Sequence, residues 1–174
     1  MFEQKPTDQQ LRQLTWVLFV ALLIIYPVMA YFFFLAESPS DVFVMGQLSF
    51  SGEILKDYYF RTKNLDAYRT AQILDYIFMV VYGGLLCVFS LKAGRKFDAS
   101  SKYRNIGQNL AAGALVAAIC DAFENGFILL TLDNPFGFPD WYAIIHSFLA
   151  LIKWILIFIC FIWIILANIA AKRK

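Results

Sequence analysis

Four long apolar stretches dominate this sequence and restrict the chain to a membrane fold. A bilayer core about 30 Å thick is crossed by roughly 20 apolar residues in an α-helix. No stretch shows the short alternating pattern of an outer-membrane barrel. The sequence therefore predicts an all-α bundle of four transmembrane helices, built as one membrane domain over residues 1–174. The predicted spans cover residues 15–36, 71–91, 106–132 and 141–167.

The composition supports the same class of protein. Hydrophobic residues make up 60% of the chain and aromatic residues 18%, whereas soluble domains are about half apolar. The net charge is only +2, and no basic run with interleaved aromatics indicates nucleic-acid binding. The three cysteines lie in apolar stretches without CxxC spacing, which favours small buried side chains over a zinc site or disulfides. We therefore expect no metal and no cofactor.

Basic residues predict the orientation of the spans, because they are enriched in cytoplasmic segments. Of the 15 Lys and Arg residues, four lie in the first loop (37–70), Lys153 lies inside the fourth span, and ten lie in the second loop and the two terminal segments. The sequence therefore predicts a multi-pass protein of the cell (inner or plasma) membrane with both termini in the cytoplasm. The ten residues are Lys5, Arg12, Lys92, Arg95, Lys96, Lys102, Arg104, Lys172, Arg173 and Lys174.

The first loop contains a predicted amphipathic helix. In the segment from Ser51 to Phe60, apolar side chains gather on one side and charged side chains on the other. Ser51 is a suitable N-cap. We expect this helix to lie on the outer membrane face, and a loop this long is more often a lid or a partner surface than a spacer. The apolar side consists of Ile54, Leu55, Tyr58 and Tyr59.

Ionisable residues inside the predicted spans are the strongest functional signal. A charge at bilayer depth costs on the order of 3 kcal/mol, so such residues persist only when they are paired, hydrated or protonated. The helix rise of about 1.5 Å per residue places them in the outer half of the bilayer or near its midplane. We predict a ligand or proton site composed of Asp75, Asp121, Glu124, Asn125 and Lys153.

Helical spacing places these residues on common faces. Asp121, Glu124 and Asn125 follow the i, i+3, i+4 spacing and line one face of the third span. Four more residues are predicted to support the site, among them a tyrosine whose following proline frees a backbone carbonyl in the first span. They are His146, Tyr82, Trp154 and Tyr26. No catalytic residue is assigned.

The charges of this group do not balance. Three carboxylates face one lysine and one histidine of undetermined charge, and burial opposes a net negative charge. The missing positive charge has four possible sources: a proton on one carboxylate, a protonated His146, a bound cation or a cationic ligand. A purely structural role is an alternative, because buried polar contacts also hold membrane helices in register.

Known catalytic signatures are missing from the sequence. One histidine does not satisfy the spacing of a di-iron bundle. Zincin, P-loop and nucleophile-elbow motifs do not occur. Whether the chain is an enzyme therefore stays open at this point.

A recurring combination of motifs resembles an uncharacterised family of small four-helix integral membrane proteins. The motifs are LDYxF at 74–78 with YG at 82–83, DxxEN at 121–125 and KW at 153–154, and the resemblance spans most of residues 45–155. It implies a four-helix fold and this polar signature, and it implies no activity. In architecture alone, the chain is also similar to sterol isomerase and sigma-2 receptor-type proteins, although the order of motifs differs.

Three functions follow as hypotheses. The leading one is an integral membrane protein whose buried polar pocket, in the outer half of the bilayer, binds a small polar or cationic ligand or relays protons. The alternatives are an accessory or assembly subunit of a larger membrane complex, which docks through the first loop, and an intramembrane enzyme acting on a lipid-like substrate. The expected partners are the lipid bilayer, a small molecule or cation, and a membrane-complex subunit, with no nucleic acid.

Overall fold

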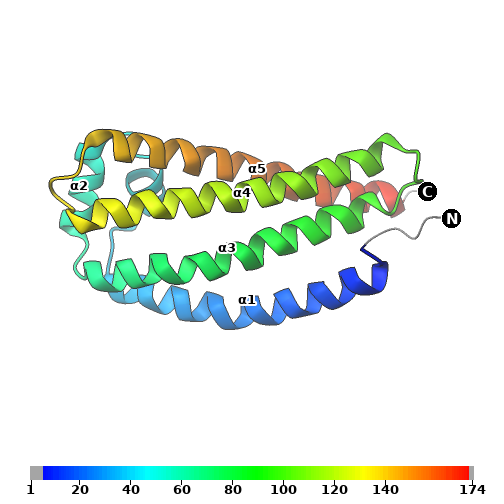
Figure 1. Cartoon of the computed structure of the whole chain (residues 1–174), viewed down its shortest axis with the longest axis horizontal. Coiled ribbons are helices and arrows are strands. Elements are labelled where there is room, and N and C mark those ends of the chain that lie inside the picture. The colour runs from blue at the N-terminus through cyan, green and yellow to red at the C-terminus, as the bar shows by residue number, and fades with distance from the viewer. Residues whose placement is uncertain (1–5, 173–174) are drawn as a thin grey trace.

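The computed structural model has four long helices side by side and a short helix across one end (Figure 1). It describes residues 6–172, apart from the side chains of Val42 and Phe43. The four long helices are each long and apolar enough to cross a membrane. The predicted fold class is therefore confirmed. In chain order the elements are α1 (Asp8–Ala36), the π-helical segment η1 (Val42–Gln47), α2 (Gly52–Arg61), α3 (Leu65–Gly94), α4 (Lys102–Asp133) and α5 (Asp140–Lys172).

Each long helix extends beyond its predicted apolar span. The additional N-terminal turns of α1, α3 and α4 are polar and begin at capping residues that accept a hydrogen bond from the backbone of the first turn. Thr7 forms a capping box with Gln10 at the start of α1. Asn64 caps α3 and Ser101 caps α4. Hydropathy detects only the apolar part of a helix's length, so these polar ends lie outside the predicted spans.

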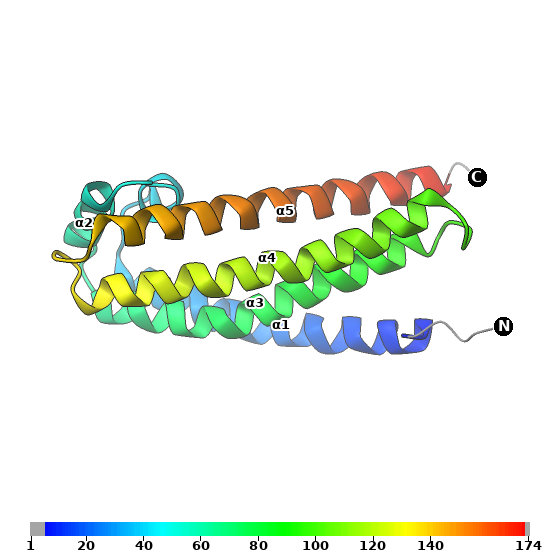
Figure 2. The ribbon, with the colours of Figure 1, turned by 45° about the horizontal axis from the view of Figure 1, so that its top comes forward.

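The four long helices form an incomplete ring. Helix α1 packs along α3, α3 along α4, and α4 along α5, with a smaller contact between α3 and α5. Helix α1 has no extensive contact with α4 or α5 among the described residues. Figures 1 and 2 show α1 and α5 on opposite sides of the α3–α4 pair.

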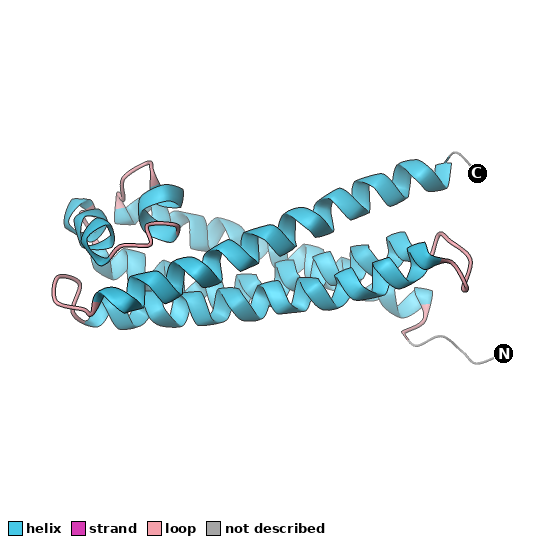
Figure 3. Ribbon diagram, turned by 90° about the horizontal axis from the view of Figure 1, so that it is seen from above, coloured by secondary structure: helices cyan, strands magenta, loops and turns pink. Residues whose placement is uncertain are grey.

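The two ends of the bundle differ. The start of α1, the end of α5 and the α3–α4 loop lie at one end, and α2, η1 and the α4–α5 loop lie at the other (Figures 1 and 3). Both described termini thus share an end, as an even number of spans requires. Lys5, Arg173 and Lys174, which contributed to the predicted orientation, lie outside the described residues.

Helix α2 covers one end of the bundle. Its predicted N-cap is confirmed, because the Ser51 hydroxyl accepts a hydrogen bond from the Ile54 amide. Its aromatic face does not rest on the membrane surface as expected: Tyr58 and Tyr59 pack against Tyr68 of α3 and other buried side chains of the bundle. The Tyr59 hydroxyl lies 2.7 Å from the Thr131 hydroxyl, and burial raises the pKa of Tyr59 well above its usual range. The α2 face therefore belongs to the protein core, which offers a better-packed surface than the headgroup layer.

Small residues bring α3 and α4 together. A methyl group placed on Gly83 would lie 2.7 Å from Ala118 Cβ, and one on Gly107 would lie 2.7 Å from Gly94 Cα. Close backbone approach of this kind is typical of membrane helix pairs. The close contact at these positions sets the rotation of both helices about their axes.

Candidate functional site

Lys153 lies at the centre of a buried ion-pair network. Its Nζ atom is 2.7 Å from Asp121 Oδ1 and 2.5 Å from Glu124 Oε2. The two carboxylates lie three residues apart on α4 and present the same face to α5, as their spacing predicted. Glu124 is 0% exposed, and Asp121 and Lys153 are each 4% exposed. One lysine ammonium thus forms ion pairs with two carboxylates in a region shielded from water.

His146 extends this network along α5. It lies seven residues before Lys153, on the same helix face, and it is completely buried. Its Nε2 atom is 3.8 Å from Glu124 Oε1, which is beyond hydrogen-bond distance. The sequence predicted His146 as a residue that supports the site, and the packing of α4 against α5 encloses its ring beside Glu124.

Asp75 of α3 occupies a different position. Its Oδ2 atom accepts a hydrogen bond of 2.7 Å from the Asn125 side-chain amide, which also donates to the Gln72 carbonyl at 3.3 Å. No cationic side chain among residues 6–172 lies within ion-pair distance of Asp75. Asp75 is therefore the carboxylate that remains after Lys153 has been shared by the other two.

Two further side chains hold the network in place. The Tyr82 hydroxyl of α3 donates a 2.7 Å hydrogen bond to Asp121 Oδ2. The Trp154 indole N–H donates a 2.8 Å hydrogen bond to Gln47 Oε1, and the Lys153 Nζ atom lies 5.6 Å from the centre of the Trp154 ring. Trp154 thus connects η1 to α5 beside the charged group.

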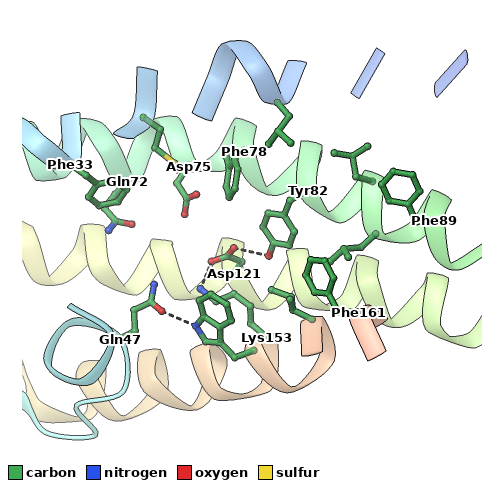
Figure 4. Close-up of a pocket in the computed structure, with 16 residues that line it drawn as sticks. Phe33, Gln47, Gln72, Asp75, Phe78, Tyr82, Phe89, Asp121, Lys153 and Phe161 are labelled. Atoms are coloured by element: carbon green, nitrogen blue, oxygen red, sulfur yellow. Dashed lines mark hydrogen bonds and ion pairs between the residues drawn. The ribbon is translucent and has the colours of Figure 1, made fainter. Parts of the chain in front are cut away.

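A cavity of about 500 Å³ adjoins the network. It is bounded mainly by α1, α3 and α5, and Figure 4 shows polar side chains from Gln47 and Gln72 to Lys153 toward one end, with Phe89 and Phe161 at the other. Its volume falls within the range of about 300–1,000 Å³ that is usual for ligand pockets. The lining residues are Leu22, Met29, Phe33, Gln47, Gln72, Asp75, Phe78, Tyr82, Leu85, Leu86, Phe89, Asp121, Lys153, Trp154, Ile157 and Phe161.

The structure divides the residues singled out in the sequence into three groups. Five line the cavity: Asp75, Tyr82, Asp121, Lys153 and Trp154. Three are buried beside it: Glu124, Asn125 and His146. Tyr26 alone forms the third group, because it is 55% exposed and packs on the Phe78 ring next to a shallow hollow of about 370 Å³.

Sequence reasoning missed Gln47 and Gln72. Gln47 lies in the first loop, where no periodic pattern marks it. Gln72 lies one residue inside the predicted start of the second span and three residues before Asp75, so its i, i+3 relation to Asp75 was an available signal. The fold brings both amides to the polar end of the cavity.

The arrangement of acidic groups does not resemble a metal centre. Among the described residues, no set of three or more His, Cys, Asp or Glu side chains is positioned to hold a metal ion. The lysine ammonium occupies the space between Asp121 and Glu124. What the geometry offers is a negatively charged wall with hydrogen-bonding groups, next to an apolar volume.

Comparisons with known proteins do not assign the chain to a family. No family model, no curated protein and no solved structure matches it. The resemblance drawn from the motifs is therefore supported only in its coarser part, the four long apolar helices of a multi-pass membrane protein.

Proposed function

We propose that the protein binds a small organic cation in the cavity beside α3, with Asp75 as its counter-ion. The observation that carries this proposal is that Asp75 lines the cavity and has a neutral amide, and no described cation, as its close partner. Asp75 is half-buried, and a carboxylate at bilayer depth without a positive partner is costly. A bound amine would remove that cost.

The aromatic lining supports a cation as well. Phe78, Tyr82 and Trp154 all line the cavity, and the faces of aromatic rings attract cations by about 0.5–2 kcal/mol. Lys153 forms no ion pair with Asp75, because its ammonium contacts Asp121 and Glu124. The polar end of the cavity is therefore negative overall, even with Lys153 in its wall.

A matched pair of fluorescence quenchers tests the proposal. The cationic nitroxide 4-amino-TEMPO and the neutral 4-hydroxy-TEMPO differ mainly in charge, and each quenches Trp154 when it occupies the cavity. In a variant with Trp154 as its single tryptophan, we expect the amine to bind at least tenfold more tightly than the alcohol. Asp75→Asn is expected to remove this preference, since a tenfold change in affinity corresponds to about 1.4 kcal/mol, a reasonable value for one charge pair.

The control for this experiment is Asp66→Asn. Asp66 lies on the same helix, is exposed, and undergoes the same change of charge. It should leave the preference for the amine intact. Equal quenching by the two nitroxides in the unmodified site would overturn the proposal.

Proton transfer is the second candidate function. Titratable side chains follow one another across three helices, from His146 through Glu124, Lys153 and Asp121 to Tyr82, with successive separations of 3.8, 2.5, 2.7 and 2.7 Å. Such a row suits a proton relay. A proton relay would transfer protons without binding an organic cation in the cavity. Equal quenching by the two nitroxides would therefore favour this candidate.

We also propose that α2 and the polar end of the cavity face the outside of the cell membrane, with both termini in the cytoplasm. The support is the basic charge at the opposite end, where Lys92 lies in the last turn of α3 and Arg95 and Lys96 begin the α3–α4 loop. In a cysteine-free background, an impermeant maleimide should label Glu53→Cys in intact cells and Ser100→Cys only after permeabilisation. Both positions are exposed, so the reverse result would invert the orientation.

A further inference from the structure

We infer that the ligand of this cavity is a single-chain amphiphile with a cationic headgroup, which enters from the bilayer between α1 and α5. This inference rests on the proposed function, because it takes the cationic site at Asp75 as its starting point. It goes further by identifying the class of molecule and its route of entry.

The cavity is polar at one end and apolar along the rest of its length. Gln47, Gln72 and Asp75 lie at the end nearest η1, and Phe89 and Phe161 lie at the opposite end (Figure 4). Asp121 and Lys153 also line the cavity, and the rest of its lining consists of leucine, isoleucine, methionine and aromatic side chains. A small hydrophilic amine would fill the polar end alone and leave the longer apolar part without a matching group.

The dimensions of the apolar part favour a chain over a compact group. Asp75 and Phe89 both line the cavity and are fourteen residues apart on the same continuous helix, which corresponds to about 21 Å along the helix axis. A volume of about 500 Å³ spread over this length is narrow. An alkyl chain anchored by its headgroup at Asp75 matches both the length and the narrow cross-section.

The arrangement of the helices gives such a chain access from the bilayer. Residues of α1 and α5 form opposite walls of the cavity, including Leu22 on one side and Ile157 and Phe161 on the other, yet these two helices have no extensive contact with each other. At the polar end, η1 is held over the cavity by the hydrogen bond from Trp154 to Gln47. The path between α1 and α5 is therefore the less obstructed one.

The energetics of entry make the headgroup the source of selectivity. A chain that moves from lipid into this apolar cavity exchanges one hydrocarbon environment for another, so it gains little from the hydrophobic effect. The headgroup, in contrast, gains an ionic partner in Asp75. We therefore expect an amine and an alcohol with the same chain to reach the bilayer equally, but only the amine to be retained in the cavity.

Photolabelling tests this inference directly. The probes are hexadecylamine and hexadecanol, each carrying a diazirine at the far end of the chain. The protein is reconstituted in vesicles of digalactosyldiacylglycerol, whose headgroup is uncharged, and labelled positions are mapped by mass spectrometry. We expect the amine to label the apolar end of the cavity, at Phe89 and Phe161, at least fivefold more than the alcohol does. Asp75→Asn should abolish this difference and Asp66→Asn should preserve it.

A second variant addresses the chain without altering the charge. Leu22→Phe adds volume to the α1 wall of the cavity and should reduce amine labelling of Phe89 and Phe161 at least threefold, while quenching of Trp154 by 4-amino-TEMPO is unchanged. The matched control is Ile24→Phe, because Ile24 is 63% exposed and does not line the cavity. It should leave both measurements unchanged.

The outcomes separate this inference from the proposed function. Equal labelling of Phe89 and Phe161 by the amine and the alcohol would overturn the inference that the ligand is a cationic amphiphile. If 4-amino-TEMPO were still preferred in an Asp75-dependent way, the proposed cation site would remain supported. If the protein with Asp75 intact showed no preference for 4-amino-TEMPO over 4-hydroxy-TEMPO, the cation site itself would be rejected. Unchanged amine labelling in Leu22→Phe would place the chain elsewhere and would likewise overturn the inference.

Discussion

Replacing Lys153 with methionine is expected to lower the free energy of unfolding by about 3–5 kcal/mol, which is the usual cost of removing one partner from a buried ion pair. The substitution nearly preserves the length of the side chain, so the loss comes mainly from charge. Asp121 and Glu124 would remain buried with their shared cation removed. Equilibrium unfolding in mixed micelles of dodecyl sulfate and dodecyl maltoside, followed by tryptophan fluorescence, measures the effect.

The chain provides a matched control for this experiment. Lys63 contacts Glu37 at 2.6 Å, a distance similar to that of the Lys153 pairs, but both side chains are exposed. Exposed ion pairs contribute little because water and salt screen them. Lys63→Met should therefore unfold like the wild-type protein.

A triple variant distinguishes charge from packing. Combining Lys153→Met with Asp121→Asn and Glu124→Gln removes the unpaired carboxylates and should recover much of the lost stability, because neutral polar groups are less costly to bury than charges. Wild-type stability of the single Lys153→Met variant would contradict the prediction. It would mean that the two carboxylates carry no charge in the native protein.

Gly107→Ala is the second substitution with a large expected effect. The added methyl group would lie 2.7 Å from Gly94 Cα and 2.9 Å from the Ser90 carbonyl oxygen, and both contacts are with backbone atoms of α3. Backbone cannot move aside as a flexible side chain does, so α3 and α4 must separate. Overpacking of this kind costs about 1–3 kcal/mol, measurable by the same unfolding assay.

Gly113→Ala is the control for the second experiment. Gly113 also lies on α4, but a methyl group there meets only Leu156 Cδ2, at 3.8 Å, which is an ordinary van der Waals distance. Both substitutions change helix propensity equally, so the difference between them isolates the close approach. Equal stability of the two variants would contradict the proposed role of the Gly94–Gly107 contact.

The structure confirms the parts of the sequence analysis that depend on local patterns. Hydropathy identified all four long helices, and Ser51 was recognised as a helix start from its type and position. The i, i+3, i+4 spacing correctly placed Asp121 and Glu124 on one face of α4. These inferences succeeded because they involve residues within one or two turns of each other.

Contacts between distant segments were less accessible to prediction. The sequence indicated a surplus of carboxylates but did not identify Asp75 as the one without a cationic partner among residues 6–172. Gln47 was overlooked, and Tyr26 was placed with the site although it does not line the cavity. The positions of Asp75 and Tyr26 depend on how far each helix is rotated about its axis, which periodicity alone does not define, and the position of Gln47 depends on the path of the first loop.

By itself, the sequence determined the four membrane-crossing helices and the excess of acidic over basic groups within them, because hydrophobicity and charge are properties of single residues. The tertiary structure decided which carboxylates share Lys153, that α2 closes one end of the bundle, and that a cavity remains beside α3. The physical reason is packing: small residues such as Gly94 and Gly107 bring α3 and α4 into contact, and this contact orients the polar faces. The separation of α1 from α5 then leaves Asp75 facing the cavity.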